Sequence, residues 1–128
     1  MDSTPLRILV IDDNRDAAEL LVLLLKQLGH TGQAAFNADS GISLAESFKP
    51  DVIFLDLILP DADGGTLPEA LREAVGSHSC RIFALTAHGS ESDRARADQA
   101  GFDGYFLKPM EPARLYNILK PSPAQMTS

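Results

Sequence analysis

A chain of 128 residues, 45% of them hydrophobic, is long enough for one compact domain with a buried core and too short for two. Its 18 acidic residues against 11 basic ones give a formal net charge of -7, and no two Lys or Arg residues are adjacent. This balance argues against nucleic acids and anionic membranes as direct partners, because both attract positively charged surfaces.

Short apolar runs alternate five times with segments of helical periodicity along the chain, starting with an apolar run. The predicted strands span residues 6–12, 31–36, 51–56, 81–86 and 104–107, and the second has the weakest apolar pattern. The predicted helices span residues 15–28, 40–48, 65–76, 91–100 and 112–119. Such alternation is typical of a parallel sheet wrapped by helices, so the predicted fold class is α/β.

Residues that favour helix ends support these boundaries. Asp39 or Ser40 can cap the start of the second helix. Pro68 is compatible with the third helix only in its first turn. The first, third and fourth helices are each followed by a glycine suited to a helix end: Gly29, Gly76 and Gly101. The fourth helix offers only alanines to the core, so we expect it to pack loosely.

Neither a membrane span nor a signal peptide is expected. The longest apolar run, AAELLVLLLKQL, is interrupted by Glu19 and Lys26, and the opening MDSTPLR lacks a signal-peptide pattern. The lone Cys80 has no second thiol for a disulfide or a metal site, which favours a reducing cytoplasm. We expect a cytoplasmic protein with one domain at residues 1–120 and a flexible tail at 121–128.

Polar side chains close four of the five predicted strands. The carboxyl ends of parallel strands share one edge of a sheet, and ligands bind in the crevice there. The residues in question are Asp12 and Asp13 after the first strand, Asp56 on the third, Thr86 on the fourth and Lys108 after the fifth. We therefore expect three carboxylates, a hydroxyl and an amine along one rim.

Taken singly, each of these residues has an ordinary structural explanation, such as Asp13 with Asn14 capping the first helix. Together they are not explained by such structural roles, because three clustered carboxylates repel one another unless a cation or ammonium compensates them. Mg²⁺ is bound in proteins by one or two carboxylates, with water and substrate phosphate completing its octahedron. The pattern therefore favours a site for a hard divalent cation such as Mg²⁺.

Four segments carry a family resemblance: VIDD, VIFLDLILPDADG, ALTAHG and GYFLKPM. In this order, spacing and strand context they resemble a response-regulator receiver domain, the phosphoacceptor of two-component signalling. The resemblance covers residues 6–120. It implies a flavodoxin-like (βα)5 fold with a parallel five-stranded sheet of order 2-1-3-4-5.

The resemblance implies that Asp56 accepts a phosphoryl group from a histidine kinase or a histidine phosphotransfer protein. It also implies that Mg²⁺ is bound directly by Asp13, Asp56 and the backbone carbonyl of Ile58, and through water by Asp12. Such a chain is a signalling phosphoacceptor that catalyses its own phosphorylation and dephosphorylation. The residue chemistry agrees, because phosphoryl transfer needs mainly positioning and charge neutralisation, and a carboxylate nucleophile forms an acyl phosphate.

The same resemblance assigns roles around the phosphoryl group. Lys108 would pair with the phosphoryl oxygens, and Thr86 would donate to one of them with the Ala87 N–H nearby. The peptide bond before Pro109 would be cis and aim Lys108 into the site. Tyr105 has the place of an aromatic switch residue, and strand alternation puts it on the face opposite Lys108.

Two positions influence hydrolysis of the acyl phosphate in the family. Ile58 stands two residues after Asp56 and offers no polar group to align a water molecule. His88, two residues after Thr86, offers an imidazole for that role. By contrast, His30 and His78 look like loop residues without a metal-ligating neighbour.

Two other functions compete with this interpretation. An aspartyl-phosphate phosphatase of the haloacid dehalogenase type needs a second Asp where this chain has Ile58. A flavodoxin-like FMN carrier needs a phosphate-binding loop after the first strand, where DDNRDA would repel phosphate unless a metal intervened. The cognate kinase, the signal, and the choice between a downstream protein target and self-association stay open. So does the choice between a free regulator and part of a hybrid kinase.

Overall fold

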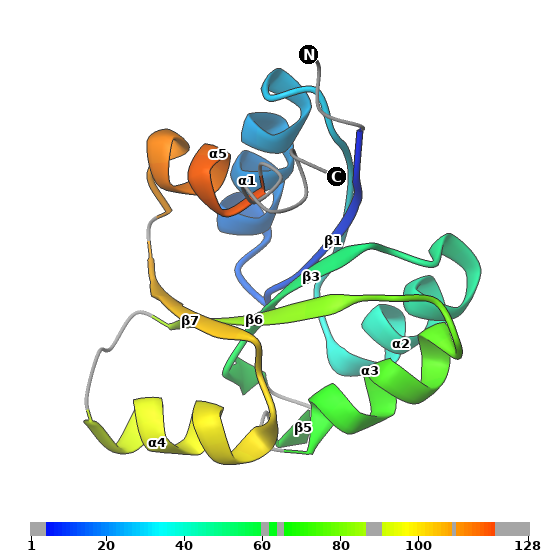
Figure 1. Ribbon diagram of the computed structural model, residues 1–128, viewed down its shortest axis with the longest axis vertical. Coiled ribbons are helices and arrows are strands. Elements are labelled where there is room, and N and C mark those ends of the chain that lie inside the picture. The colour runs from blue at the N-terminus through cyan, green and yellow to red at the C-terminus, as the bar shows by residue number, and fades with distance from the viewer. Residues whose placement is uncertain (1–4, 60–61, 64–65, 87–90, 109, 120–128) are drawn as a thin grey trace, which may run out of the picture.

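A computed structural model describes residues 5–59, 62–63, 66–86, 91–108 and 110–119 of the chain (Figure 1). One sheet contains five parallel strands in the order β2-β1-β3-β6-β7. They are β1 (Arg7–Ile11), β2 (Thr31–Ala35), β3 (Val52–Asp56), β6 (Arg81–Thr86) and β7 (Gly104–Leu107). Counted along the chain, this is the order 2-1-3-4-5, so the predicted fold class and strand order are confirmed.

Five helices cover the two faces of this sheet. They are α1 (Arg15–Gln27), α2 (Ala38–Phe48), α3 (Leu67–Val75), α4 (Glu91–Ala100) and α5 (Pro112–Leu119). Figure 1 shows α1 and α5 on one side of the sheet and α2, α3 and α4 on the other. Each predicted helix and strand is present, with ends that differ from the prediction by at most two residues.

An antiparallel pair of two-residue strands follows β3 and was not predicted. It joins β4 (Ile58–Leu59) to β5 (Ala62–Asp63) outside the main sheet. Strands this short leave no apolar alternation in the sequence, which is why the pattern missed them. The predicted tail, residues 121–128, lies outside the described part of the chain.

The start of α2 differs from the prediction. Asn37 is the N-cap, and its side chain accepts a hydrogen bond of 2.8 Å from the Ser40 backbone N–H. Asp39 and Ser40 therefore lie inside the helix, and the predicted cap was wrong. The Asn37 side chain satisfies an N–H group that would otherwise lack a partner in the first turn, so the helix begins earlier.

The predicted ends of the other helices are confirmed. Gly76 ends α3 with a φ of 66°, in the left-handed region that suits glycine. Two further glycines with positive φ follow α1 and α4: Gly29 and Gly101. Pro68 lies in the first turn of α3, where its missing N–H has no helical partner to lose.

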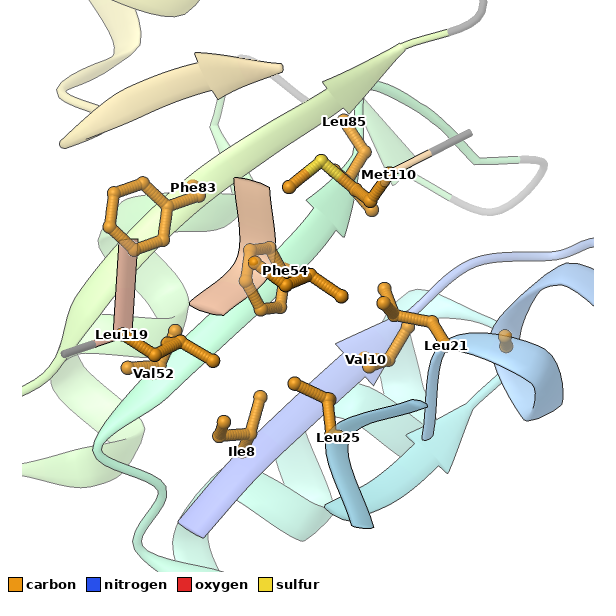
Figure 2. Close-up of a cluster of buried hydrophobic side chains, with 12 residues drawn as sticks. Ile8, Val10, Leu21, Leu25, Val52, Phe54, Phe83, Leu85, Met110 and Leu119 are labelled. Atoms are coloured by element: carbon orange, nitrogen blue, oxygen red, sulfur yellow. The ribbon is translucent and has the colours of Figure 1, made fainter. Parts of the chain in front are cut away.

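The core has one layer on each face of the sheet because β1, β3 and β6 are covered on both faces. Figure 2 shows Ile8, Val10 and Phe54 directed toward the same layer as Leu25 and Leu119. The alternate residues of these strands, including Leu9 and Ile53, pack against α2 and α3 on the other face. This double burial explains why the strands read as continuous apolar runs instead of alternating patterns.

The contact between α4 and the sheet is small. Among the α4 residues whose burial is described, Ala97 is the buried one, and it packs with Leu57 and Ala84. A helix with so few buried apolar contacts is expected to have low local stability.

Elsewhere, Cys80 is half-buried, and burial raises the pKa of its thiol to about 11, which fits a small apolar side chain. Within the described ranges, none of the helices is long and apolar enough to span a bilayer.

Basic side chains at the amino edge of the sheet bind the carbonyl groups that end the helices. The hydrogen bonds run from Arg7 to the Phe48 carbonyl (2.7 Å), from Lys49 to the Ala74 and Val75 carbonyls (3.2 and 3.3 Å) and from Arg72 to the Gly101 carbonyl (2.9 Å). Neither α2 nor α4 has a basic residue in its last turn. Neighbouring segments thus supply the positive charge that favours a helix carboxyl end.

His30 links the end of α1 to the start of the sheet. Its ring is buried, and Nδ1 accepts a hydrogen bond of 3.0 Å from the Leu6 backbone N–H. This bond requires an Nδ1 without a proton, so the ring must be neutral in the fold. Burial also lowers the pKa of His30, because it disfavours the charged imidazolium.

We predict that the protein loses stability as the pH falls through the ordinary histidine pKa of about 6.5. The unfolded chain binds a proton at His30 at higher pH than the folded chain, so acid favours unfolding. The stabilisation from the neutral ring is complete above that pH, declines below it and is lost beneath the folded-state pKa. The total loss is about 1.4 kcal/mol for each unit by which folding lowers the pKa of His30.

Urea unfolding between about pH 5 and pH 7.5 measures this effect. His30→Asn keeps an acceptor but does not titrate, so its unfolding free energy should vary less with pH than that of the wild type. His78→Asn, at an exposed loop histidine, should retain the His30 contribution. Identical pH profiles for the wild type and His30→Asn would contradict the prediction.

Candidate functional site

Three acidic side chains meet where β1 and β3 end. Asp12 directly follows β1, Asp13 is next, and Asp56 is the last residue of the adjacent strand β3. Each has a carboxylate oxygen within 4.8 Å of the others. Asp12 and Asp56 are buried and Asp13 is exposed, so the cluster reaches solvent at Asp13.

The Lys108 side chain reaches into this cluster from the segment after β7. Its Nζ lies 2.6 Å from Oδ2 of Asp12 and 3.0 Å from Oδ2 of Asp56. Burial acts to lower the pKa of Lys108, but the hydrogen bonds to the two carboxylates outweigh it and the pKa is raised. The ammonium therefore stays charged and offsets part of the repulsion among the acids.

Backbone contacts hold the chain on both sides of the cluster. The Lys108 N–H donates to the Thr86 carbonyl at 2.8 Å, and the Asp12 N–H donates to the Ala35 carbonyl at 3.0 Å. Oδ1 of Asp12 accepts the Asn14 N–H at 3.0 Å, so both oxygens of Asp12 have protein partners. Asn14, rather than Asp13, caps α1 by accepting the N–H of Ala17.

Thr86 and Tyr105 lie on the same face of the sheet. Thr86 is buried at the end of β6, and alternation puts it on the face of Ala84 two residues earlier. Tyr105, on the neighbouring strand β7, packs with Ala84 and Ala97 on the α4 side. The Arg94 guanidinium of α4 lies 6.0 Å from the centre of the Tyr105 ring.

An apolar cavity adjoins the acidic cluster and was missed by sequence reasoning. Its volume is about 110 Å³, and besides Asp12 and Lys108 it is lined by Leu20, Leu85 and Met110 among others. Leu20 is 57% exposed, which places a large apolar side chain in solvent beside the charged site. The run of leucines in α1 was visible in the sequence, but its position relative to Lys108 was not.

The remaining predicted site residues are described in part or not at all. The backbone of Ile58 pairs with Asp63 in the β4–β5 hairpin, directly after the segment that carries Asp56. Ala87, His88 and Pro109 lie outside the described residues.

The donor set fits a hard divalent cation. Mg²⁺ prefers oxygen ligands and is usually held by one or two carboxylates with water completing the octahedron. The exposed Asp13 and the buried Asp56 supply such oxygens within 4.8 Å of each other. A softer metal would call for thiolate or imidazole ligands, and neither joins this group among the described residues.

Comparison with known proteins gives consistent matches. NarL, the nitrate/nitrite response regulator of Escherichia coli strain K12, is 38% identical over 118 residues, which cover 90% of this chain and 53% of NarL. RpaA of Synechocystis, a DNA-binding transcriptional regulator, is 35% identical over 105 residues, or 82% of this chain and 44% of RpaA. The chain thus spans about half the length of these two relatives.

Solved structures agree in fold. A two-component response regulator from Clostridium difficile superposes with a TM-score of 0.82 at 33% identity, covering 95% of this chain and 98% of that chain. The chemotaxis protein CheY4 of Vibrio cholerae shares the fold, with a TM-score of 0.79 at 22% identity over 91% of this chain and 97% of that chain. A family model described as "Response regulator receiver domain" matches residues 8–120. The chain belongs to the receiver domain family of two-component response regulators.

Proposed function

We propose that Asp56 accepts a phosphoryl group from a histidine kinase or a histidine phosphotransfer protein, with Mg²⁺, and that its phosphorylation changes protein contacts. One observation carries the proposal: the Lys108 ammonium bridges Asp12 and Asp56 beside the exposed Asp13. A carboxylate nucleophile, a fixed cation and oxygen ligands for a metal are what phosphoryl transfer requires. In this role the protein works in the cytoplasm, where Cys80 stays reduced.

In this mechanism an oxygen of Asp56 attacks the phosphorus of a phosphohistidine. A P–O bond forms as the P–N bond breaks, and the departing imidazole keeps the electron pair and takes up a proton. Lys108 pairs with the phosphoryl oxygens and stabilises charge in the transition state. Mg²⁺ held by Asp13 and Asp56 would supply further charge neutralisation.

The metal ligands proposed are Asp13, Asp56 and the backbone carbonyl of Ile58, with Asp12 acting through water. The contacts of Asp12 support this division, since Lys108 and the Asn14 N–H already occupy its two oxygens. Asp13 is the exposed member of the cluster and suits a direct ligand.

We predict that acetyl phosphate with Mg²⁺ modifies Asp56. Borohydride trapping followed by mass spectrometry should locate the label there, because Asp56 is the carboxylate held against Lys108 at the end of β3. Asp56→Asn should abolish labelling. Asp98→Asn, a matched change at an exposed position on α4, should leave it intact. Labelling at another acid would refute the assignment of the nucleophile.

The metal-binding roles generate a second prediction. Asp13→Ala should weaken Mg²⁺ binding by about tenfold or more and by a larger factor than Asp12→Ala, because a direct ligand contributes more than a water-mediated contact. Calorimetric titration of both variants with Mg²⁺ measures this, and Asp16→Ala in the first turn of α1 is the control. Equal losses for Asp12→Ala and Asp13→Ala would mean that the two acids share one role.

The output surface proposed is formed by α4, β7 and α5, where phosphorylation alters docking of a downstream protein or self-association. Thr86 and Tyr105 share the α4 face of the sheet, and the buried Ala97 packs α4 against that face. Drawing the Thr86 hydroxyl toward a phosphoryl oxygen would give the Tyr105 ring room to turn inward, away from Arg94. The two residues would thus act as one two-state element.

We predict that beryllofluoride with Mg²⁺ shifts backbone NMR signals across residues 86–119, well beyond the metal ligands. Thr86→Ala should suppress the distal shifts by more than half while Asp56 still accepts the phosphoryl group. Thr31→Ala, at the opposite edge of the sheet, should preserve them. Unchanged distal shifts in Thr86→Ala would show that the coupling takes another route.

A further inference from the structure

The strand β2 is an unprotected edge of the sheet. In the described part of the chain it pairs only with β1. At its two ends, the Thr31 N–H donates to the Leu6 carbonyl at 2.9 Å, and the Ala35 carbonyl accepts the Asp12 N–H at 3.0 Å. Bonding residues alternate along a parallel strand, so Gly32 and Ala34 direct their backbone N–H and C=O groups outward. Edge strands usually carry lysine, proline or a bulge against pairing, and β2 has none of these.

An open groove runs between this edge and α1. It has a volume of about 570 Å³ and is lined by Glu19, Val22, Leu23 and Lys26 of the helix and by Gly32 and Ala34 of the strand, among others. A Cβ at Gly32 would lie 3.2 Å from Cγ1 of Val22, so helix and strand are in close contact there. Leu23 is 51% exposed in the groove, which leaves a large apolar side chain without cover.

The helix face in the groove is self-complementary in charge. Glu19, Val22, Leu23 and Lys26 follow the spacing that puts residues on one helix face. The acid and the base stand at its two ends, roughly 10 Å apart along the axis and too far apart to pair with each other. An antiparallel copy of α1 centred between Val22 and Leu23 would set each Glu19 beside Lys26 of the other copy.

The strand obeys the same symmetry. In an antiparallel β2–β2 pair centred on Gly32, the outward backbone groups of Gly32 pair with those of Gly32 in the second copy, and the outward N–H of Ala34 faces the same partner strand. Because Gly32 meets Val22, the centre of this strand pair and the centre of the helix face agree along the strand to within about one helical rise, roughly 1.5 Å. One two-fold axis therefore serves both elements.

We propose that this face of α1 and the β2 edge form the interface of a homodimer. The two five-stranded sheets would join into one of ten strands, with Leu23 packed on Leu23 of the second copy. The occupant is a second copy because charge, apolar centre and strand register all match under one two-fold axis. The β7 edge lies at the other end of the sheet, so this dimer leaves α4, β7 and α5 accessible and does not depend on phosphorylation.

Sedimentation velocity on the unphosphorylated full chain, over about 10 µM to 1 mM, tests the proposal. The wild type should convert to dimer as concentration rises. Glu19→Lys and Lys26→Glu each place like charges face to face and should raise the dissociation constant about tenfold or more. The double variant carrying both changes restores opposite charges across the axis and should return to within about threefold of the wild type.

Glu46→Lys on α2 is the control. Glu46 is exposed and lies away from the groove, and its substitution changes the net charge by the same amount as Glu19→Lys. Ala34→Pro removes an outward N–H without removing a bond to β1, and should abolish the dimer with the circular dichroism spectrum unchanged. Should Ala34→Pro not fold, Leu23→Asp provides the same test from the helix. A monomeric wild type at the highest concentration, failure of the double variant to restore the dimer, or cross-links through α4 and α5 instead would each overturn the proposal.

Discussion

The positive charge of Lys108 is the interaction on which the carboxyl edge of this protein depends. Burying Asp12 and Asp56 beside Asp13 concentrates negative charge where solvent screens little of it. The ammonium, 2.6 and 3.0 Å from the two buried carboxylates, provides compensation inside the fold. Its position depends on the last strand, because the Lys108 backbone is bonded to the end of β6. The site therefore exists only when both halves of the sheet have assembled.

The common direction of the strands also decides which helix ends lie at each edge of the sheet. In a parallel sheet with helical crossovers, the helices begin at the carboxyl edge and end at the amino edge. Asn14 and Asn37 satisfy helix N–H groups at the carboxyl edge, and basic side chains such as Arg7, Lys49 and Arg72 satisfy carbonyls at the amino edge. The same geometry gathers positive helix ends at the edge where the carboxylates lie, which favours bound anions there.

The two edges of the sheet differ in how they are held. At β7, the small contact of α4 through Ala97 and the stacking of Arg94 near Tyr105 leave a surface that can rearrange at low cost. At β2, the close approach of Gly32 to Val22 makes a firm edge with outward backbone groups. A rearranging edge suits a conformational signal, and a firm edge suits constant pairing. The two proposed roles can coexist because the strand order keeps the edges apart.

The helices and strands, the main site residues and the family could be predicted from the sequence because the relevant signals are local. The alternation of apolar runs and helical periods determined the elements within two residues, and the single rule that parallel strands share a carboxyl edge brought Asp12, Asp56 and Lys108 together. Glycines with positive φ were recognisable because few other residues adopt that conformation. Segment order and spacing identified the family.

Other features were decided only by the tertiary structure, since they depend on side chains from distant segments. Asn37 rather than Asp39 caps α2, and the neutral His30 ring accepts a bond from Leu6, 24 residues away. The bridge from Lys108 to Asp56 joins residues 52 apart in the chain, and its two distances follow from the register of β7 against β6. Periodicity is encoded within a few neighbouring residues. The contacts of one side chain with another are fixed only when strand register and helix packing bring their segments together.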